Sequence, residues 1–511
     1  MAVPLTINDF LDRAIAVYPD RVAIIDEPDQ PARPMADLTY RELGEVRRSI
    51  GVALDELGVP MGGRVAVVSH NSARFLTMYY GVPGNGRVIV PINFRLKPDE
   101  VAYIVEHSGA DVLIVDPEVA DSLSGVACER VIVFGDESDA IFYGRAGEPT
   151  PWEPDEHALV SIDYTSGTTA RPKGVEQTHR ARWTNTMIMG WQLGVNDRDV
   201  YLHLVPMFHC DAWAMPYTLS AMGVTQVVQR RIDGHEILRR VERHRVTFTG
   251  ASPAVCTAVL DAAANWDGPM PGRDVLRIVV AGAPPPTSAI ERIETDLGWE
   301  FMQLYGLTET APILTGSRRR SEWDDLTPAE RARKLGRAGA PAIGVSVTIS
   351  DDGEIVARAN HILSSYWRNP EATAEAIRDG WFHTGDGGSV DDEGYITITD
   401  RKKDVIISGG ENVSSIEVED TLFSHPAVQE VAVIGVPHEK WGETVKALVV
   451  LVAGANASER ELIDHCKSRL AGYKCPTSVE IRTELARTAT GKLQKFKLRE
   501  PYWTGLTRSV N

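Results

Sequence analysis

Residues 164–175 have the sequence Tyr-Thr-Ser-Gly-Thr-Thr-Ala-Arg-Pro-Lys-Gly-Val, which is the most informative stretch of the chain. It follows an apolar run at residues 158–162 and combines Ser and Thr hydroxyls with two glycines and two cations. Glycine lets backbone N–H groups approach an oxyanion closely, hydroxyls donate further hydrogen bonds, and Arg171 and Lys173 offset negative charge. The composition therefore predicts a phosphate-binding loop, and the alternative is an ordinary polar surface turn.

The loop differs from a Walker A motif. That motif needs a lysine directly after its second glycine and then a Ser or Thr. Here Lys173 precedes Gly174, and Val175 follows. A kinase or GTPase of the Walker type is therefore disfavoured.

The composition limits the class of protein. A chain of 511 residues exceeds what one core usually supports, so we expect two or more domains. A net charge of −18 argues against a nucleic-acid partner. The five cysteines are scattered without metal-ligand spacing, which predicts reduced, structural thiols. With no signal-peptide pattern and no apolar run of membrane-spanning length, we expect a cytoplasmic protein without membrane insertion.

Short apolar strands alternate with amphipathic helices along most of the chain. Alternation of this kind predicts an α/β fold with parallel sheets. The expected strands lie at residues 22–25, 63–68, 88–92, 112–115, 130–134, 200–204, 247–250 and 275–281. The expected helices lie at residues 5–16, 40–57, 72–80, 97–108, 180–189 and 235–244. Residues 135–156 are acidic and irregular and predict a connecting surface loop.

The character of the chain changes near residue 400. Residues 400–404 form a charge run, Asp-Arg-Lys-Lys-Asp, which is either a solvated face or a linker. Downstream, Ser414 and Ser458 each precede a glutamate by three residues, which is the spacing of a helix capping box. Strands are expected at residues 428–436 and 447–452. We therefore expect a large N-terminal domain of parallel-rich sheets packed with helices at residues 1–402, and a small α+β domain at residues 403–511.

A second dense cluster occupies residues 303–310, Gln-Leu-Tyr-Gly-Leu-Thr-Glu-Thr, after a strand-like run. Tyr305 is suited to stacking on a purine and Thr308 to bonding a phosphate. Glu309 is suited to holding magnesium, which favours oxygen ligands. A strand followed by a capped helix start explains the same residues without any ligand, and these residues alone leave both interpretations open.

Two motifs resemble those of one known superfamily. The run Thr-Ser-Gly-Thr-Thr-x-x-Pro-Lys-Gly at residues 165–174 is similar to the signature loop of adenylate-forming enzymes, which include acyl-CoA synthetases, luciferases and adenylation domains of peptide synthetases. Residues 305–309 match the superfamily's Tyr-Gly-x-Thr-Glu motif. Ala170 departs from the glycine of many members. The resemblance covers nearly the whole chain, and the pattern looks most like a bacterial short- to medium-chain or aryl acyl-CoA ligase.

The resemblance implies a nucleotide site. Residues 282–284 resemble the adenine-side loop, Asp386 the carboxylate that accepts both ribose hydroxyls, and Arg401 a second ribose or phosphate contact. It also implies an interdomain hinge at Lys403, and it makes residues 406–412 the loop that reaches the active site during thioester formation. The implied contacts with ATP and coenzyme A are Thr165, Ser166, Gly167, Thr168, Thr169, Lys173, Gly282, Ala283, Pro284, Tyr305, Asp386, Arg401, Lys403, Gly409, Gly410, Glu411 and Lys474.

The resemblance also implies a catalytic lysine and an acyl pocket. Lys492, in Thr-Gly-Lys, matches the lysine that bridges the carboxylate and the α-phosphate. Residues 205–213 resemble the segment that lines the acyl pocket, although its apolar side chains fit a core equally well. Cys210 beside His209 has no matching partner for a nucleophile or a metal site. The implied catalytic residues are Lys492, Glu309, Thr308 and His209. The implied magnesium ligands are Glu309 and Thr168, and the implied pocket residues are Met207, Phe208, Trp213 and Gly306.

The resemblance implies ATP-dependent activation of a small-molecule carboxylic acid to an acyl-adenylate with release of pyrophosphate, then acyl transfer to coenzyme A. Carboxylate attack on the α-phosphorus brings anions together, so magnesium, Lys492 and the hydroxyl loop must offset the charge. One alternative keeps adenylation but uses a carrier-protein thiol, an amine or an inorganic nucleophile as acceptor. A catalytically silent nucleotide-binding protein is the other, and Lys492 and Glu309 argue against it. The oligomeric state is left open, with a homodimer as one option.

Overall fold

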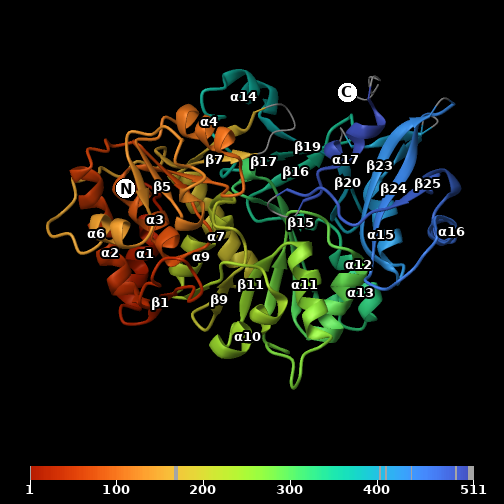
Figure 1. Ribbon diagram of the computed structural model, residues 1–511, viewed down its shortest axis with the longest axis horizontal. Helices are drawn as coiled ribbons and strands as arrows, with labels where there is room; N and C mark the ends of the chain where they lie inside the picture. The colour runs from red at the N-terminus through yellow and green to blue at the C-terminus, as the bar shows by residue number, and fades with distance from the viewer. Residues whose placement is uncertain are drawn as a thin grey trace.

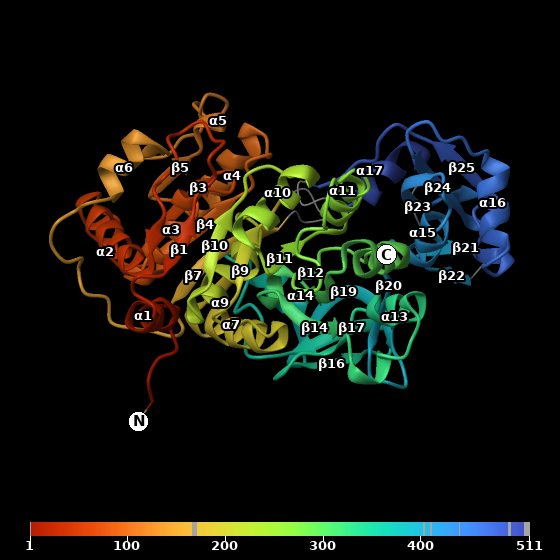
Figure 2. The same cartoon turned by 90° about the horizontal axis from the view of Figure 1, so that it is seen from below.

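Four β-sheets organise the part of the chain that the structure, a computed structural model, describes: residues 2–165, 171–401, 404–408, 411–438, 440–488 and 492–504. Figure 1 shows three of these sheets in the larger N-terminal part and the fourth, with α15 and α16, at the other end of the molecule. Figure 2 shows the same division from below, with the first strands at one end and β21–β25 at the other. The predicted fold class is confirmed.

The first sheet has the strand order β6-β5-β3-β4-β7-β8 and ends in an antiparallel hairpin. Its strands are β3 (Arg64–Val68), β4 (Val88–Ile92), β5 (Val112–Val115), β6 (Val131–Val133), β7 (Leu159–Thr165) and β8 (Lys173–Thr178). Its helices are α2 (Tyr40–Glu56), α3 (Ala73–Gly81), α4 (Pro98–Ser108), α5 (Pro117–Ala120) and α6 (Asp136–Phe142). The central strands are apolar throughout because both faces of the sheet are covered.

Helix α6 corrects the prediction of an irregular loop at residues 135–156. The Ser138 hydroxyl accepts from the Gly135 N–H, and the acidic residues of the first turn favour a helix N-terminus. Phe142 is fully buried, and Asp139 pairs with the buried Arg74. These long-range contacts stabilise a helix whose own composition resembles a loop.

The second sheet has the order β15-β14-β13-β12-β11-β9-β10-β1-β2, with parallel pairing from β13 to β1 and antiparallel edges. Its strands are β1 (Val22–Ile25), β2 (Leu38–Thr39), β9 (Val200–His203), β10 (Thr225–Val228), β11 (Phe248–Ala251), β12 (Arg277–Val280), β13 (Glu300–Gly306), β14 (Ile313–Arg318) and β15 (Ala340–Pro341). The helices of this part are α1 (Asn8–Val17), α7 (His179–Leu193), α8 (Cys210–Trp213), α9 (Met215–Ala221), α10 (Gly234–His244), α11 (Pro253–Ala263), α12 (Thr287–Arg292) and α13 (Pro328–Leu335).

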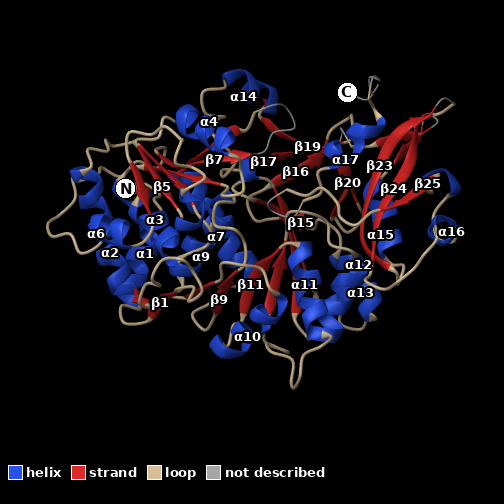
Figure 3. Ribbon diagram, in the orientation of Figure 1, coloured by secondary structure: helices blue, strands red, loops and turns tan. Residues whose placement is uncertain are grey.

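The last two sheets are smaller. The third contains β16 (Ser346–Ile349), β17 (Glu354–Arg358), β18 (Ile377–Arg378), β19 (Trp381–Val390) and β20 (Ile396–Arg401), with α14 (Pro370–Ala376) beside it. The fourth contains β21 (Ile406–Ser408), β22 (Glu411–Val413), β23 (Val428–His438), β24 (Gly442–Leu451) and β25 (Ser478–Ile481). Figure 3 shows this fourth sheet with α15 (Ser415–Phe423) and α16 (Glu459–Lys467), and α17 (Lys495–Arg499) near β23.

The shorter helical turns are η1 (Pro83–Asn85), η2 (Ile293–Leu297), η3 (Thr308–Thr310), η4 (Ser321–Trp323), η5 (Gly472–Lys474) and η6 (Glu500–Tyr502). Strand β20 ends at residue 401 in the third sheet and β21 begins at residue 406 in the fourth. The proposed domain boundary at residues 402 and 403 lies between them, outside the described residues, and stays a prediction. Among the described residues, no helix is both long enough and apolar enough to cross a membrane.

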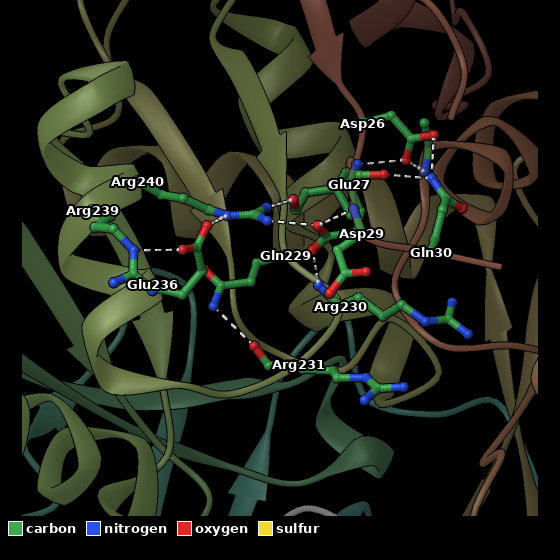
Figure 4. A network of polar contacts seen from close by, with 12 residues as sticks. Asp26, Glu27, Asp29, Gln30, Gln229, Arg230, Arg231, Glu236, Arg239 and Arg240 are labelled. Atoms are coloured by element: carbon green, nitrogen blue, oxygen red, sulfur yellow. Dashed lines mark hydrogen bonds and ion pairs between the residues drawn. The ribbon is translucent and has the colours of Figure 1, made fainter. Parts of the chain in front are cut away.

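A buried network of charges joins β1 to β10 and α10 (Figure 4). Glu27, after β1, accepts from Arg240 at 2.6 Å and from the Arg230 N–H at 2.8 Å. Arg240 also donates to Glu236 and to the Val228 carbonyl oxygen. Arg240 and Glu27 are 4% and 3% exposed. Each strong donor therefore has an acceptor inside the protein, as buried charges require.

Candidate active site

Strands β7 and β8, on either side of the predicted phosphate loop in the sequence, pair as an antiparallel hairpin. Thr165 and Lys173 face each other across the hairpin, and the Thr165 hydroxyl lies 3.5 Å from the Lys173 carbonyl oxygen. The Arg171 guanidinium lies over the Tyr103 ring, and the Lys173 ammonium lies 5.0 Å from the centre of the Tyr366 ring. Arg171 and Lys173 are thus each held against an aromatic ring. Ser166, Gly167, Thr168 and Thr169 lie outside the described residues.

Tyr305, Asp386 and Arg401 meet although they come from three strands, β13, β19 and β20. The Tyr305 hydroxyl donates to Asp386 Oδ2 at 2.8 Å, and Arg401 Nε lies 3.5 Å from Asp386 Oδ1. Burial and the charge of Asp386 raise the pKa of Tyr305 well above its usual range, so the phenol stays a donor. The two partners orient the carboxylate on which the predicted ribose contact depends.

Gly306 follows Tyr305 at a close approach of two strands. A Cβ atom there would lie 1.6 Å from the Pro312 carbonyl oxygen. A β-bulge between Tyr305 and Gly306 accompanies this approach. The glycine is therefore required by the backbone, whatever its predicted role in the acyl pocket.

Glu309 is held by residues that the sequence analysis did not single out. It lies in η3, and its Oε1 accepts from the Tyr366 hydroxyl at 2.8 Å. The Gln177 side chain of β8 donates to the Thr308 carbonyl oxygen at 2.9 Å. Burial and the Glu309 charge raise the pKa of Tyr366 above its usual range, which keeps this donor protonated. Tyr366 was missed because it is 57 residues from Glu309 along the chain.

The predicted magnesium site is consistent with the chemistry of these residues. Within the described ranges, no three His, Cys, Asp or Glu side chains gather as a metal cluster. Magnesium is commonly held by one or two carboxylates together with substrate phosphates and water. Glu309, oriented by Tyr366, whose ring also lies beside Lys173, fits that kind of donor set, and Thr168 lies outside the described residues.

Lys492 of the C-terminal part reaches the N-terminal part. A Cβ atom on Gly282, which follows β12, would lie 3.5 Å from Lys492 Cε. Burial and the positive charge of Arg401 lower the pKa of Lys492, and Asp386 and Glu309 oppose this shift. Burial and the charge of Lys492 also lower the pKa of His209 to about 3. The structure therefore brings Lys492 close to Gly282 of the adenine-side loop, which continues with Ala283 and Pro284. It also places Lys492 within electrostatic reach of Arg401, Asp386, Glu309 and His209.

Of the predicted coenzyme A contacts, the structure describes Glu411 and Lys474. Glu411 is exposed at the start of β22. The Lys474 ammonium lies 2.6 Å from a Glu417 carboxylate oxygen on α15, and these hydrogen bonds raise the pKa of Lys474. Lys403, Gly409 and Gly410 lie outside the described residues.

The acyl segment is buried and passes between two cores. Met207 and Phe208 pack in the cluster around the first sheet, and the Met207 N–H donates to Asn71 Oδ1 at 2.7 Å. Trp213 packs in a second cluster, where the Gly250 position on β11 makes room for its ring. The segment that includes His209 thus lies at the junction of the two clusters.

The same segment contains an unusual backbone conformation. Residues 210–214, which include α8, are Cys-Asp-Ala-Trp-Ala, and their φ angles are 51°, 50°, 51°, 62° and 60°, so α8 is a left-handed turn and not a right-handed helix. None is glycine, and the left-handed region disfavours L-residues by roughly 1–2 kcal/mol each. Strain of this kind persists only where the surrounding structure enforces it, commonly at functional sites.

A buried cluster of charges contacts this turn. Arg182 of α7 lies 2.7 Å from Asp211 and 3.4 Å from Asp163 of β7, with side-chain exposures of 0%, 0% and 2%. The Ser161 hydroxyl lies between the carboxylates, 2.8 Å from Asp163 and 2.9 Å from Asp211. The only signal in the sequence was the presence of charged residues within apolar runs, which does not reveal their pairing.

The chain is similar to known proteins over nearly its whole length. Residues 11–367 match the family model described as AMP-binding enzyme, and residues 417–492 match its C-terminal domain model. The chain is 36% identical to 4-hydroxybutyrate--CoA ligase 2 of Metallosphaera sedula over 96% of this chain and 93% of that protein.

Two solved structures have the same fold. The anthranilate CoA ligase AuaEII in complex with anthranoyl-AMP has a TM-score of 0.87 and 28% identity, over 98% of each chain. The O-succinylbenzoate coenzyme A synthetase MenE from Bacillus subtilis, in complex with ATP and a magnesium ion, has a TM-score of 0.81 and 29% identity, over 96% of this chain and 99% of that chain.

Proposed function

Because this chain belongs to the AMP-binding enzyme family of adenylate-forming acyl-CoA ligases, we propose that it converts a carboxylic acid and ATP to an acyl-adenylate and pyrophosphate, then transfers the acyl group to coenzyme A. The observation that carries the proposal is the position of Lys492 over Gly282, within electrostatic reach of Asp386 and Glu309. This arrangement suits the adenylation half-reaction, in which a cation must approach the α-phosphate.

Asp386, Lys492 and His209 would each have a separate role around a bound nucleotide. Asp386, oriented by Tyr305 and Arg401, would accept the ribose hydroxyls. Lys492 would offset the charge that develops as the carboxylate attacks the α-phosphorus. The low pKa of His209 keeps its imidazole neutral beside Lys492, so it does not add a second cation there.

Glu309 and Thr168 would hold magnesium, which when bound offsets the charge of the phosphates. Tyr366 would keep Glu309 turned toward that position. The hydroxyls of residues 165–169 and the Lys173 ammonium would bind the phosphates.

The second half-reaction needs other residues of the C-terminal part. We propose that this part rotates about Lys403, so that residues 409–411 replace Lys492 beside the acyl-adenylate. Lys474 would then meet coenzyme A after leaving Glu417. The proposal is supported by the exposure of Glu411 at the start of β22 and by the pairing of Lys474 with Glu417 of α15.

The nature of the acid is proposed from the acyl segment. Met207, Phe208 and Trp213 are apolar, which favours a short- to medium-chain or aryl acid. The relatives named above act on acids as different as 4-hydroxybutyrate and anthranilate, so their names do not assign one to this chain. A cytoplasmic location stays a prediction, and the oligomeric state stays open.

The test is incubation of the purified protein with ATP, magnesium and a library of carboxylic acids, with pyrophosphate measured first and thioester after addition of coenzyme A. We expect acid-dependent pyrophosphate release in the wild-type protein and its loss in Lys492→Ala. Release of ADP and phosphate would contradict adenylation. Pyrophosphate release without a thioester would contradict coenzyme A as acceptor.

A further inference from the structure

We infer that Arg182, with Asp163 and Asp211, is a positioning cluster that holds residues 210–214 in their left-handed turn and thereby determines where His209 and Trp213 lie in the acyl pocket. The cluster would act on acid specificity through the turn, without touching the acid. This inference rests on the proposed function for its kinetic consequences, and its structural consequence can be tested without them.

All five residues of the turn are buried in the core, and Asp211 gives the turn its charged anchor. Asp211, its second residue, is anchored at one carboxylate oxygen by Arg182 at 2.7 Å and by the Ser161 hydroxyl at 2.9 Å. Within the turn, backbone hydrogen bonds run from the Ala212 N–H to Met207 and from the Ala214 N–H to Asp211. Five consecutive residues in a disfavoured region need an external anchor, and Asp211 supplies one from inside the turn.

Arg182 also connects the turn to the rest of the site. Its second terminal nitrogen donates to the Ala311 carbonyl oxygen at 2.9 Å, two residues beyond Glu309. Asp163, its third partner, lies on β7 two residues before Thr165. One guanidinium therefore contacts the acyl turn, the segment of the predicted magnesium ligand and the strand that leads into the phosphate loop. The planar, forked donor group of arginine suits such a junction, and lysine does not reproduce it.

The charges of the cluster are compatible with burial. Burial and the nearby Asp211 raise the pKa of Asp163 well above its usual range, which favours the neutral acid. The Ser161 hydroxyl has one hydrogen but lies within hydrogen-bond distance of both carboxyl groups. A proton on Asp163 supplies the second hydrogen that these two contacts need.

The cluster is poorly suited to a purely stabilising role. Arg182 Nε, Asp163 Oδ1 and Asp211 Oδ1 are buried without a partner among the described residues. Buried ion pairs often stabilise less than apolar side chains of similar volume, and unpaired buried polar atoms are unfavourable. A role in positioning accounts for these groups where a role in stability does not.

The test compares Arg182→Lys with Arg240→Lys. Arg240 is a matched control because it is also a buried arginine whose guanidinium donates to a carboxylate and to a backbone carbonyl oxygen, in the network of Figure 4. For Arg182→Lys we expect about a tenfold rise in KM for the acid, an altered ranking of acids in the library and little change in KM for ATP. For Arg240→Lys we expect a lower melting temperature and an unchanged ranking.

A rescue experiment separates positioning from general damage. Glycine adopts positive φ without penalty, so Ala212→Gly in the Arg182→Lys background should restore much of the affinity for the acid. Asp211→Asn is a second route if Arg182→Lys does not fold, because the amide keeps the shape and removes the charge. Equal loss of stability in the two arginine variants, with the ranking of acids unchanged and no rescue, would overturn the inference.

Crystal structures of the folded variants give a readout independent of activity. We expect residues 210–214 to leave the left-handed region in Arg182→Lys, or in Asp211→Asn, and to keep it in Arg240→Lys. An unchanged turn in the cluster variant would overturn the inference even if the protein proved not to be a ligase. Failure of the proposed function itself would appear in the wild-type protein, as an absence of acid-dependent pyrophosphate release.

Discussion

At the scale of single residues, the surroundings of Lys492 oppose its positive charge. Burial and Arg401 lower its pKa from the ordinary 10.5. The ammonium must be protonated to offset charge on the α-phosphate, so activity should be present below the lowered pKa and fall as pH rises through it. We expect an alkaline limb in kcat/KM for pyrophosphate release with a midpoint below 10.5. In Lys492→Arg, where the guanidinium stays charged, any residual activity should lack that limb; persistence of the limb would assign it to another group.

The hydrogen bond from Tyr366 to Glu309 gives a second prediction at the scale of residues. Its hydroxyl donates to Glu309 at 2.8 Å, and a hydrogen bond to a charged group contributes about 1.5–3 kcal/mol. Tyr366→Phe keeps the ring beside Lys173 and removes only this donor. We expect the magnesium concentration that half-saturates pyrophosphate release to rise about tenfold, with the melting temperature nearly unchanged. Titration with magnesium measures it, and Glu309→Gln should show the same defect more strongly. An unchanged titration in both variants would remove Glu309 from the metal site.

At the scale of elements, β11 passes close to the acyl turn at Gly250. A Cβ atom there would lie 2.8 Å from the Tyr201 hydroxyl and 3.2 Å from the Trp213 ring. Gly250→Ala should therefore push Trp213 toward the pocket, shift preference to smaller acids and lower the free energy of unfolding by about 1–3 kcal/mol. Competition between acids of increasing size, with thermal unfolding, measures both.

The matched control for Gly250→Ala is Gly190→Ala on α7, where the added methyl would meet Thr218 at an ordinary 3.7 Å. We expect no change in the ranking of acids there. If Gly250→Ala lowers stability and leaves the ranking unchanged as well, Trp213 belongs to the core and does not end the pocket.

The elements themselves were largely predictable from local pattern. Strands β4 and β5 have the predicted bounds because an uninterrupted apolar run predicts a buried strand. Strand β10 and helix α11 were missed. In β10 the buried Gln226 interrupts the apolar run, and it is satisfied by His203 and Tyr80 from distant parts of the chain. Long-range pairing of this kind leaves no periodic signal.

The residues of the candidate site, like the helices and strands, were only partly predictable from the sequence. Residues within short motifs, such as Tyr305 and Glu309, were identified from the sequence as candidates, and the structure brings several of them together. Tyr366 and Arg182 were not identified, because their partners are far away in sequence and only the fold reveals the distances. The motifs therefore predict the chemistry of the site, whereas the residues that orient the motif side chains are identified only by tertiary contacts.

At the scale of the whole molecule, the two parts of the chain meet at a contact that rotation of the C-terminal part would break. Asp420 of α15 accepts from both the N–H and the hydroxyl of Thr287, at 2.9 Å and 3.0 Å, at the start of α12. This contact joins the part that carries Lys492 to the part that carries Gly282. It should therefore favour the arrangement suited to adenylation and oppose the one suited to thioester formation.

Asp420→Ala tests that role because it removes the acceptor without touching the predicted site. A contact of this kind shifts the equilibrium between two arrangements only by its own free energy, about 1–2 kcal/mol for a partly buried charged acceptor, or about a tenfold change. We expect pyrophosphate release to slow by that factor, while conversion of a supplied acyl-adenylate to thioester is unchanged or faster. Asp464→Ala on α16, an exposed acid with no contact to the N-terminal part recorded among the described residues, is the control and should affect neither step. Equal slowing of both half-reactions by Asp420→Ala would mean that the Thr287 contact does not distinguish the two arrangements, which would contradict this role of Asp420 in the proposed rotation.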